Sequence, residues 1–163
     1  MIKRLLLTLW LQTWFYFIAG IQVLIYFPFL VIILTLPKAY TKLFWIARNI
    51  WARITLHGSG YYVSVENKEK LESQTNCLII ANHSSHMDVF LMLIANKKPF
   101  MFVGKKELYS IPLFGYIYKR AAIMVDRSDP ISRFEVYGKA NEMLKRGYNV
   151  CIFPESHYMD DTI

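Results

Sequence analysis

The stretch from Leu5 to Pro37 contains no charged side chain and is dominated by Leu, Ile, Phe, Trp and Tyr. Such a composition is typical of a segment that lies in lipid. One bilayer-crossing helix needs about 20 residues, so a run of about 33 is long for one helix and short for two. Pro28 also interrupts the run. These features predict either a re-entrant or shallow two-helix hairpin or a single tilted span.

Basic residues flank this apolar run on both sides: Lys3 and Arg4 precede it, and Lys38, Lys42 and Arg48 follow it. The positive-inside rule places both flanks on the cytoplasmic side, so we expect the protein in the cell membrane with the part of the chain after the apolar run facing the cytoplasm. From Tyr40 to Arg53 basic and apolar residues interleave, which predicts a helix along the lipid headgroups.

The formal net charge is +7 and 55% of the residues are hydrophobic. This combination suits an anionic membrane surface or phosphorylated substrates. No basic block resembles a nucleic-acid-binding arm, so we expect no nucleic-acid partner.

Cys77 and Cys151 lie at the edges of apolar runs without a partner at metal-ligand spacing, and we expect both to be reduced and packed.

Beyond the apolar run, strand-like and helix-like patterns alternate. We predict strands at Tyr61–Val65, Leu78–Ala81, Pro99–Val103, Ala122–Asp126 and Asn149–Phe153, and helical segments at Ser85–Ala95, Glu107–Lys119 and Ile131–Lys145. Gly104 and Gly115 are expected at turns. The alternation predicts an α/β fold with a largely parallel sheet flanked by helices, preceded by an N-terminal apolar helical membrane anchor. We divide the chain into an anchoring and interfacial segment, residues 1–56, and an α/β domain, residues 57–163.

Polar side chains follow four of the predicted strands: His83, Lys105, Arg127 and Glu155. In open α/β sheets, ligands bind where the carboxyl ends of the strands meet the following loops. We therefore expect these four side chains to face one crevice.

Asn82-His83-Ser84-Ser85-His86-Met87-Asp88 combines a histidine with a carboxylate five positions later. His83 can act as a general base near neutral pH, and Asp88 can hold its tautomer and stabilise the imidazolium. An alternative remains open on spacing alone. Ser85 and Asp88 form a pattern like a capping box, in which Asp88 only caps a helix.

Two other chemistries are possible. His83, His86 and Asp88 could be drawn as metal ligands, but there is no His-Glu-x-x-His pattern and we expect no metal, with His86 at the rim of the site. Ser59, Ser84 or Ser85 could act as a hydrolase nucleophile, although no Gly-x-Ser-x-Gly elbow is present.

Asn82-His83-x-x-x-x-Asp88 resembles the His-x4-Asp signature of the glycerolipid acyltransferases, the family of 1-acylglycerol-3-phosphate acyltransferases. Three later stretches resemble the family's other motifs in the same order: Gly104 to Gly115, Ala121 to Arg127, and Val150 to Glu155. The resemblance covers Asn82 to Glu155. Four ordered matches are a specific signal, whereas the first motif alone would be common by chance.

The resemblance implies a membrane-bound enzyme of phospholipid biosynthesis that moves an acyl chain from acyl-CoA or acyl-carrier protein to a lysophospholipid in the bilayer, without a further cofactor. His83 would take the proton of the acceptor hydroxyl and Asp88 would support it. Among the substrate-binding residues that it implies, Arg127 would pair with the acceptor's phosphate and Lys105 would add a positive charge. Glu155 would bind the glycerol hydroxyl or orient its loop.

Several positions depart from the family's usual pattern: Ala121 replaces Gly, Met124 replaces Phe, and Ser156-His157-Tyr158 replaces Gly-Thr-Arg. The family's following strand is also missing before the end at Ile163, so we expect a C-terminally truncated domain. Two alternatives to an active acyltransferase follow. One is an inactive or truncated membrane-associated fragment of the family, and the other is an interfacial serine lipid hydrolase.

Overall fold

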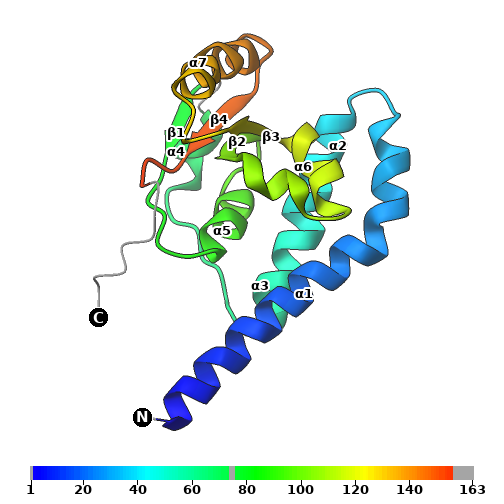
Figure 1. Ribbon diagram of the computed structural model, residues 1–163, viewed down its shortest axis with the longest axis vertical. Helices are drawn as coiled ribbons and strands as arrows, with labels where there is room; N and C mark the ends of the chain where they lie inside the picture. The colour runs from blue at the N-terminus through cyan, green and yellow to red at the C-terminus, as the bar shows by residue number, and fades with distance from the viewer. Residues whose placement is uncertain (1, 74–75, 156–163) are drawn as a thin grey trace.

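The computed structural model describes residues 2–73 and 76–155 (Figure 1). Within them lies a four-stranded sheet with the strand order β1-β4-β2-β3. The strands are β1 (Leu78–Ile80), β2 (Phe100–Lys105), β3 (Ala122–Val125) and β4 (Asn149–Ile152). The helical elements are α1 (Ile2–Leu34), α2 (Ala39–Ile46), the π-helical turn η1 (Ala47–Trp51), α3 (Ala52–Gly58), α4 (Lys68–Ser73), α5 (Met87–Ala95), the 3-10 helix η2 (Lys106–Ser110), α6 (Phe114–Ala121) and α7 (Pro130–Lys145).

All strand pairs of this sheet are parallel, which confirms the predicted α/β class. The register pairs Ile79 with Cys151 and Phe102 with Cys151, so these side chains lie on one face. Figure 1 shows α5 and α7 on opposite sides of the sheet. Helix α7 begins at a side-chain cap, because Asp129 accepts a hydrogen bond from the Ile131 amide.

The predicted strand at Tyr61–Val65 is wrong. This segment has no regular secondary structure and leads from α3 toward α4. Its alternating pattern still has a physical basis, because Val63 and Val65 pack against the hydrophobic core. The segment has no assigned strand partner among the described residues, and alternation alone does not make a strand. Helix α4 was not predicted.

The apolar run forms one continuous helix rather than a hairpin that turns at Pro28. Helix α1 contains Pro28 and ends at Leu34. A proline inside an apolar helix removes one backbone hydrogen bond and bends the helix more readily than it ends it. Figure 1 shows the axis of α1 changing direction in its second half. Within the described residues, Leu7–Leu34 is long and apolar enough to cross a membrane.

The chain returns from α1 through α2, η1 and α3, which confirms the helix predicted from Tyr40 to Arg53. Arg48, however, does not simply face outward. Its guanidinium donates hydrogen bonds to the carbonyl oxygens of Asn96, at 2.8 Å, and Ile94, at 3.3 Å. A cation there satisfies carbonyl groups at the C-terminus of α5 and complements the helix dipole.

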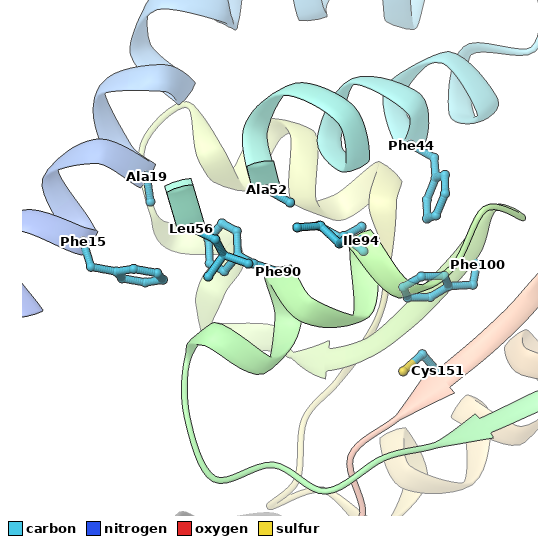
Figure 2. Close-up of a cluster of buried hydrophobic side chains, with 10 residues drawn as sticks. Phe15, Ala19, Phe44, Ala52, Leu56, Phe90, Ile94, Phe100 and Cys151 are labelled. Atoms are coloured by element: carbon cyan, nitrogen blue, oxygen red, sulfur yellow. The ribbon is translucent and has the colours of Figure 1, made fainter. Parts of the chain in front are cut away.

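The main hydrophobic core joins α1, α2 and α3 to α5 and the sheet. Its buried members are Phe15, Ala19, Phe44, Ala52, Leu56, Phe90, Leu93, Ile94, Phe100 and Cys151 (Figure 2). Phe15 of α1 contacts Phe90 of α5 edge to face, with ring centroids 5.3 Å apart. Cys77 and Cys151 are free thiols, and burial raises the pKa of Cys151 to about 12. The division at residue 56 stays a prediction, since helices on both sides of it build this core.

Gly104 and Gly115 are glycines for reasons of space rather than of turn geometry. Neither has a positive φ angle. A Cβ at Gly104 would lie 1.9 Å from the Tyr118 hydroxyl, and a Cβ at Gly115 would lie 1.8 Å from the Tyr109 carbonyl oxygen. The close approach at Gly115 holds η2 against α6, directly after Lys105.

We therefore expect Gly115→Ala to lower the free energy of unfolding by at least about 2 kcal/mol, because backbone must move to admit the methyl group. Gly138→Ala is the matched control. Gly138 lies within α7, and a Cβ at this position would have nothing within 4 Å. Alanine there should stabilise the helix by about 0.5–1 kcal/mol. Denaturant titration in detergent measures the unfolding free energies of both variants. Equal changes in the two variants would contradict the packing argument for Gly115.

Candidate active site

The site lies at the carboxyl ends of β1 and β4, which are neighbours in the sheet. The loop after β1 carries His83, and the segment after β4 carries Phe153 and Glu155. This adjacency brings together residues that are 72 positions apart, because a Glu155 carboxylate oxygen accepts a hydrogen bond from the His83 amide. Glu155 therefore holds the His83 loop in place.

His83 and Asp88 lie in direct contact. The distance from His83 Nδ1 to Asp88 Oδ2 is 3.2 Å, and the two side chains are 20% and 17% exposed. With its proton on Nδ1, the imidazole donates to the carboxylate and leaves Nε2 unprotonated. This arrangement suits a general base whose tautomer is held by an acid.

Asp88 also binds the backbone of the same loop. Its Oδ2 accepts hydrogen bonds from the amides of Ser84 and Ser85, both at 2.8 Å. Ser85 Oγ in turn accepts from the Met87 amide at 3.2 Å. The capping interaction and the histidine contact therefore coexist in one carboxylate, and geometry does not force a choice between them.

Phe153 provides the floor of the site. Its ring stacks on His83 with centroids 4.3 Å apart and an angle of 18° between the planes. Phe102 stacks on Phe153 in turn, at 5.7 Å. The imidazole is thus fixed by a carboxylate at its edge and by an aromatic ring on its face.

Lys105 and Arg127 lie farther along the same edge of the sheet. Lys105 is the last residue of β2, and Arg127 follows β3, the outermost strand opposite β1. Three strand spacings separate β1 from β3, about 14 Å in all. Tyr118 lies near both residues. Its hydroxyl donates to the Lys105 carbonyl at 3.1 Å, and the positive charge of Arg127 acts to lower its pKa. Burial is the larger effect and raises the pKa of Tyr118 to about 12.

Asp126 does not need Arg127 as its partner. Its carboxylate accepts hydrogen bonds from the backbone amide and the hydroxyl of Ser128, at 3.1 and 2.6 Å, and lies 3.6 Å from Lys106 Nζ. The bonds from Ser128 are the main reason why the pKa of Asp126 is lowered.

The four predicted site residues lie along one edge of the sheet. His83 and Glu155 are close together, and Arg127 follows the strand at the far side.

His86 contacts helix α1. Its ring meets the ring of Tyr16 edge to face, with centroids 5.6 Å apart. Burial lowers the pKa of His86, and the positive charges of His83 and Lys105 add to this effect. Among residues 2–73 and 76–155, no group of three or more His, Cys, Asp or Glu side chains is arranged to hold a metal ion. Ser156, His157 and Tyr158 lie outside the described residues.

An apolar cavity of about 150 Å³ lies behind the site, between α1, α2, α5, α6 and the sheet. Val89, Leu93, Phe100, Phe102 and Ile117 are among its lining residues. Phe102 lies between this cavity and the His83 site, because it stacks on Phe153, which stacks on His83. Sequence patterns alone do not indicate this cavity, since its walls come from segments far apart in the chain.

Comparisons with known proteins show what the chain is similar to. The family model described as Acyltransferase matches residues 62–162. The chloroplastic 1-acyl-sn-glycerol-3-phosphate acyltransferase of Arabidopsis thaliana is 30% identical over 109 residues, which is 66% of this chain and 30% of that protein. The 1-acyl-sn-glycerol-3-phosphate acyltransferase of Escherichia coli is 31% identical over 101 residues, which is 59% of this chain and 40% of that protein.

The fold has a solved counterpart. The crystal structure of the 1-acyl-sn-glycerophosphate acyltransferase PlsC from Thermotoga maritima resembles this chain with a TM-score of 0.76 and 25% identity. The match covers 97% of this chain and 64% of the Thermotoga chain. This chain spans only about a third of the length of the curated relatives named above. The family model, in contrast, covers more than half of this chain, and the chain therefore belongs to the acyltransferase family.

Proposed function

We propose that the protein is a membrane-bound acyltransferase that moves an acyl chain from acyl-CoA or acyl-carrier protein to the free hydroxyl of 1-acylglycerol-3-phosphate. The contact between His83 Nδ1 and Asp88 Oδ2, at 3.2 Å, carries this proposal, because it leaves Nε2 as a base. The names of the relatives from Arabidopsis and Escherichia coli support the choice of acceptor.

In the proposed reaction, His83 Nε2 removes the proton from the acceptor hydroxyl, and that oxygen attacks the carbonyl carbon of the thioester. The tetrahedral intermediate collapses as the carbon–sulfur bond breaks. The proton then passes from the imidazolium to the leaving sulfur. The products are phosphatidate and a free thiol, and Asp88 stabilises the imidazolium between the two proton transfers.

The other site residues would bind the substrates. Arg127 would pair with the phosphate through its planar guanidinium, and Lys105 would contribute a second positive charge. Glu155 would act by positioning the His83 loop, as its bond to the His83 amide supports. The apolar cavity beside Phe102 would hold an acyl chain. No further cofactor is needed for these steps.

Helix α1 would anchor the protein in the cell membrane, with the site on the cytoplasmic side. Large apolar side chains are exposed along it, including Leu24, Ile25, Phe29 and Ile32, each more than half exposed. Such a surface is unfavourable in water and suits contact with lipid. The acceptor and the product both reside in the bilayer, so the anchor would keep the site beside its substrate.

The test is product formation by the purified protein in detergent micelles. Lysophosphatidate and other lysophospholipids are each offered with palmitoyl-CoA and with palmitoyl-acyl-carrier protein, and phosphatidate and released thiol are measured. We expect equimolar phosphatidate and thiol with at least one donor. No product with either donor would overturn the proposal. Labelling of a serine by a fluorophosphonate, together with release of free fatty acid, would indicate a hydrolase instead.

A further inference from the structure

A second cavity opens between the N-terminal half of α1 and the loop that carries His83. Its volume is about 250 Å³, and none of its lining residues belongs to the apolar cavity described above. The polar side chains that line this groove are Thr8, Gln12, Tyr16, Tyr61, Ser85 and His86. Two of them, Ser85 and His86, come from the stretch between His83 and Asp88.

Thr8, Gln12 and Tyr16 form a polar row along one face of the mostly apolar helix α1. They are spaced four residues apart, so they share one face of α1. Polar residues within a membrane helix are costly to expose to lipid and usually face a protein interior or a water-filled cavity. Here the row faces the groove beside the active-site loop, which points to a ligand-binding role rather than to lipid contact.

The two walls of the groove are held together by packing beside this row. Phe15, the neighbour of Tyr16, is buried to 7% exposure and points toward Phe90 in the domain core (Figure 2). Tyr16 itself contacts His86 at a ring angle of 68°. These contacts hold α1 in a defined position beside the site loop, so the groove between them is part of the packed fold.

The groove combines apolar and polar side chains and has no formally charged group among its described lining residues. Leu11, Phe15 and Met87 lie beside hydroxyl groups, one amide and the imidazole of His86. Burial lowers the pKa of His86 and so favours its neutral form. Neutral donors and acceptors suit hydroxyls and ester carbonyls, whereas a phosphate is bound more strongly by cationic donors.

We infer that this groove binds the glycerol and ester groups of the acceptor lysolipid, with Gln12 and Tyr16 of α1 as binding residues. The inference rests on the proposed function and extends it from the sheet to the membrane helix. The acceptor's acyl chain would stay in the bilayer beside Leu7 and Leu11, which are exposed on α1. Its free hydroxyl would then reach His83 from the side of the membrane.

The test compares Gln12→Leu and Tyr16→Phe with the wild-type protein, using 1-oleoyl-lysophosphatidate in mixed micelles. Each substitution removes a polar group and keeps most of the volume. Losing one hydrogen bond should raise the KM for the acceptor about 2- to 12-fold, while kcat and the KM for the thioester stay within about twofold. Thr13→Val is the matched control, because Thr13 donates to the Leu9 carbonyl within α1 and does not line the groove.

Binding of 1-oleoyl-lysophosphatidate in the absence of a thioester donor tests the groove separately from the proposed acyltransferase function. Tryptophan fluorescence measures this binding. Weaker binding by Gln12→Leu but not by Thr13→Val supports the groove, even if the wild-type protein shows no turnover. An acceptor KM and affinity that are unchanged in both groove variants would overturn the inference and leave the proposed function standing. An effect of Thr13→Val equal to that of Gln12→Leu would overturn it as well.

Discussion

Replacement of His83 by alanine should reduce kcat for thioester-dependent formation of phosphatidate by about 10²- to 10⁴-fold, the usual contribution of general-base assistance. The imidazole contacts Asp88 through Nδ1, so its Nε2 is the atom that can take the hydroxyl proton. The variant should also lose some stability, because the largely buried ring no longer stacks on Phe153, but it should stay folded, since the backbone amide still donates to Glu155. Initial rates and a thermal melt of the same sample measure both effects.

His57→Ala is the matched control for this prediction. His57 is an exposed histidine near the end of α3, and its ring lies 6.0 Å from that of Tyr62, far in sequence from the site loop. The variant should keep the wild-type kcat. A His83→Ala protein that is folded and retains more than about a tenth of the wild-type rate would contradict the role of His83 as base.

The parallel α/β arrangement could be predicted from the sequence because each short apolar run is followed by a helical pattern with clear end signals. Asp129 before Pro130, and Gly147 after Lys145, mark the two ends of α7, and Gly147 has the positive φ angle expected of such an end. The contact between His83 and Asp88 could be predicted for a similar reason. His83 and Asp88 are only five positions apart at the turn from β1 to α5, so few backbone conformations of this turn are possible.

The strand order could not be predicted from local patterns, although it decides the shape of the site. The last strand, β4, inserts between β1 and β2, which brings Glu155 to His83 and moves Arg127 to the far edge. Register and insertion depend on contacts between distant segments, and no single stretch of sequence contains them. The failure at Tyr61–Val65 has the same origin, since a strand needs a neighbour with available backbone groups.

The anchor helix differs from a hairpin for another physical reason. Pro28 and the length of the run suggested a turn, but an apolar helix can continue through one proline and bend. The polar row of Thr8, Gln12 and Tyr16 is visible in the sequence as a spacing of four residues. Only the packing of α1 against the site loop indicates what this row faces.

Asp88→Asn and Asp88→Ala should separate the two roles of this carboxylate. In Asp88→Asn, the amide oxygen can still accept the hydrogen bonds from the Ser84 and Ser85 amides, which lie 2.8 Å from Oδ2 in the wild-type protein. The negative charge that would stabilise the His83 imidazolium in the proposed reaction is lost. We therefore expect kcat to fall about 10²- to 10⁴-fold in Asp88→Asn, with a small change in melting temperature.

Asp88→Ala should lose the same activity and also stability, because both amides lose their acceptor at the start of α5. The loss of such a capping group usually costs about 1 kcal/mol of unfolding free energy. Denaturant titration and initial rates of the two variants make the comparison. Nearly full activity in Asp88→Asn would show that Asp88 only caps the loop. A shared loss of activity with unequal stability would instead show that one oxygen serves both the fold and the proton transfer.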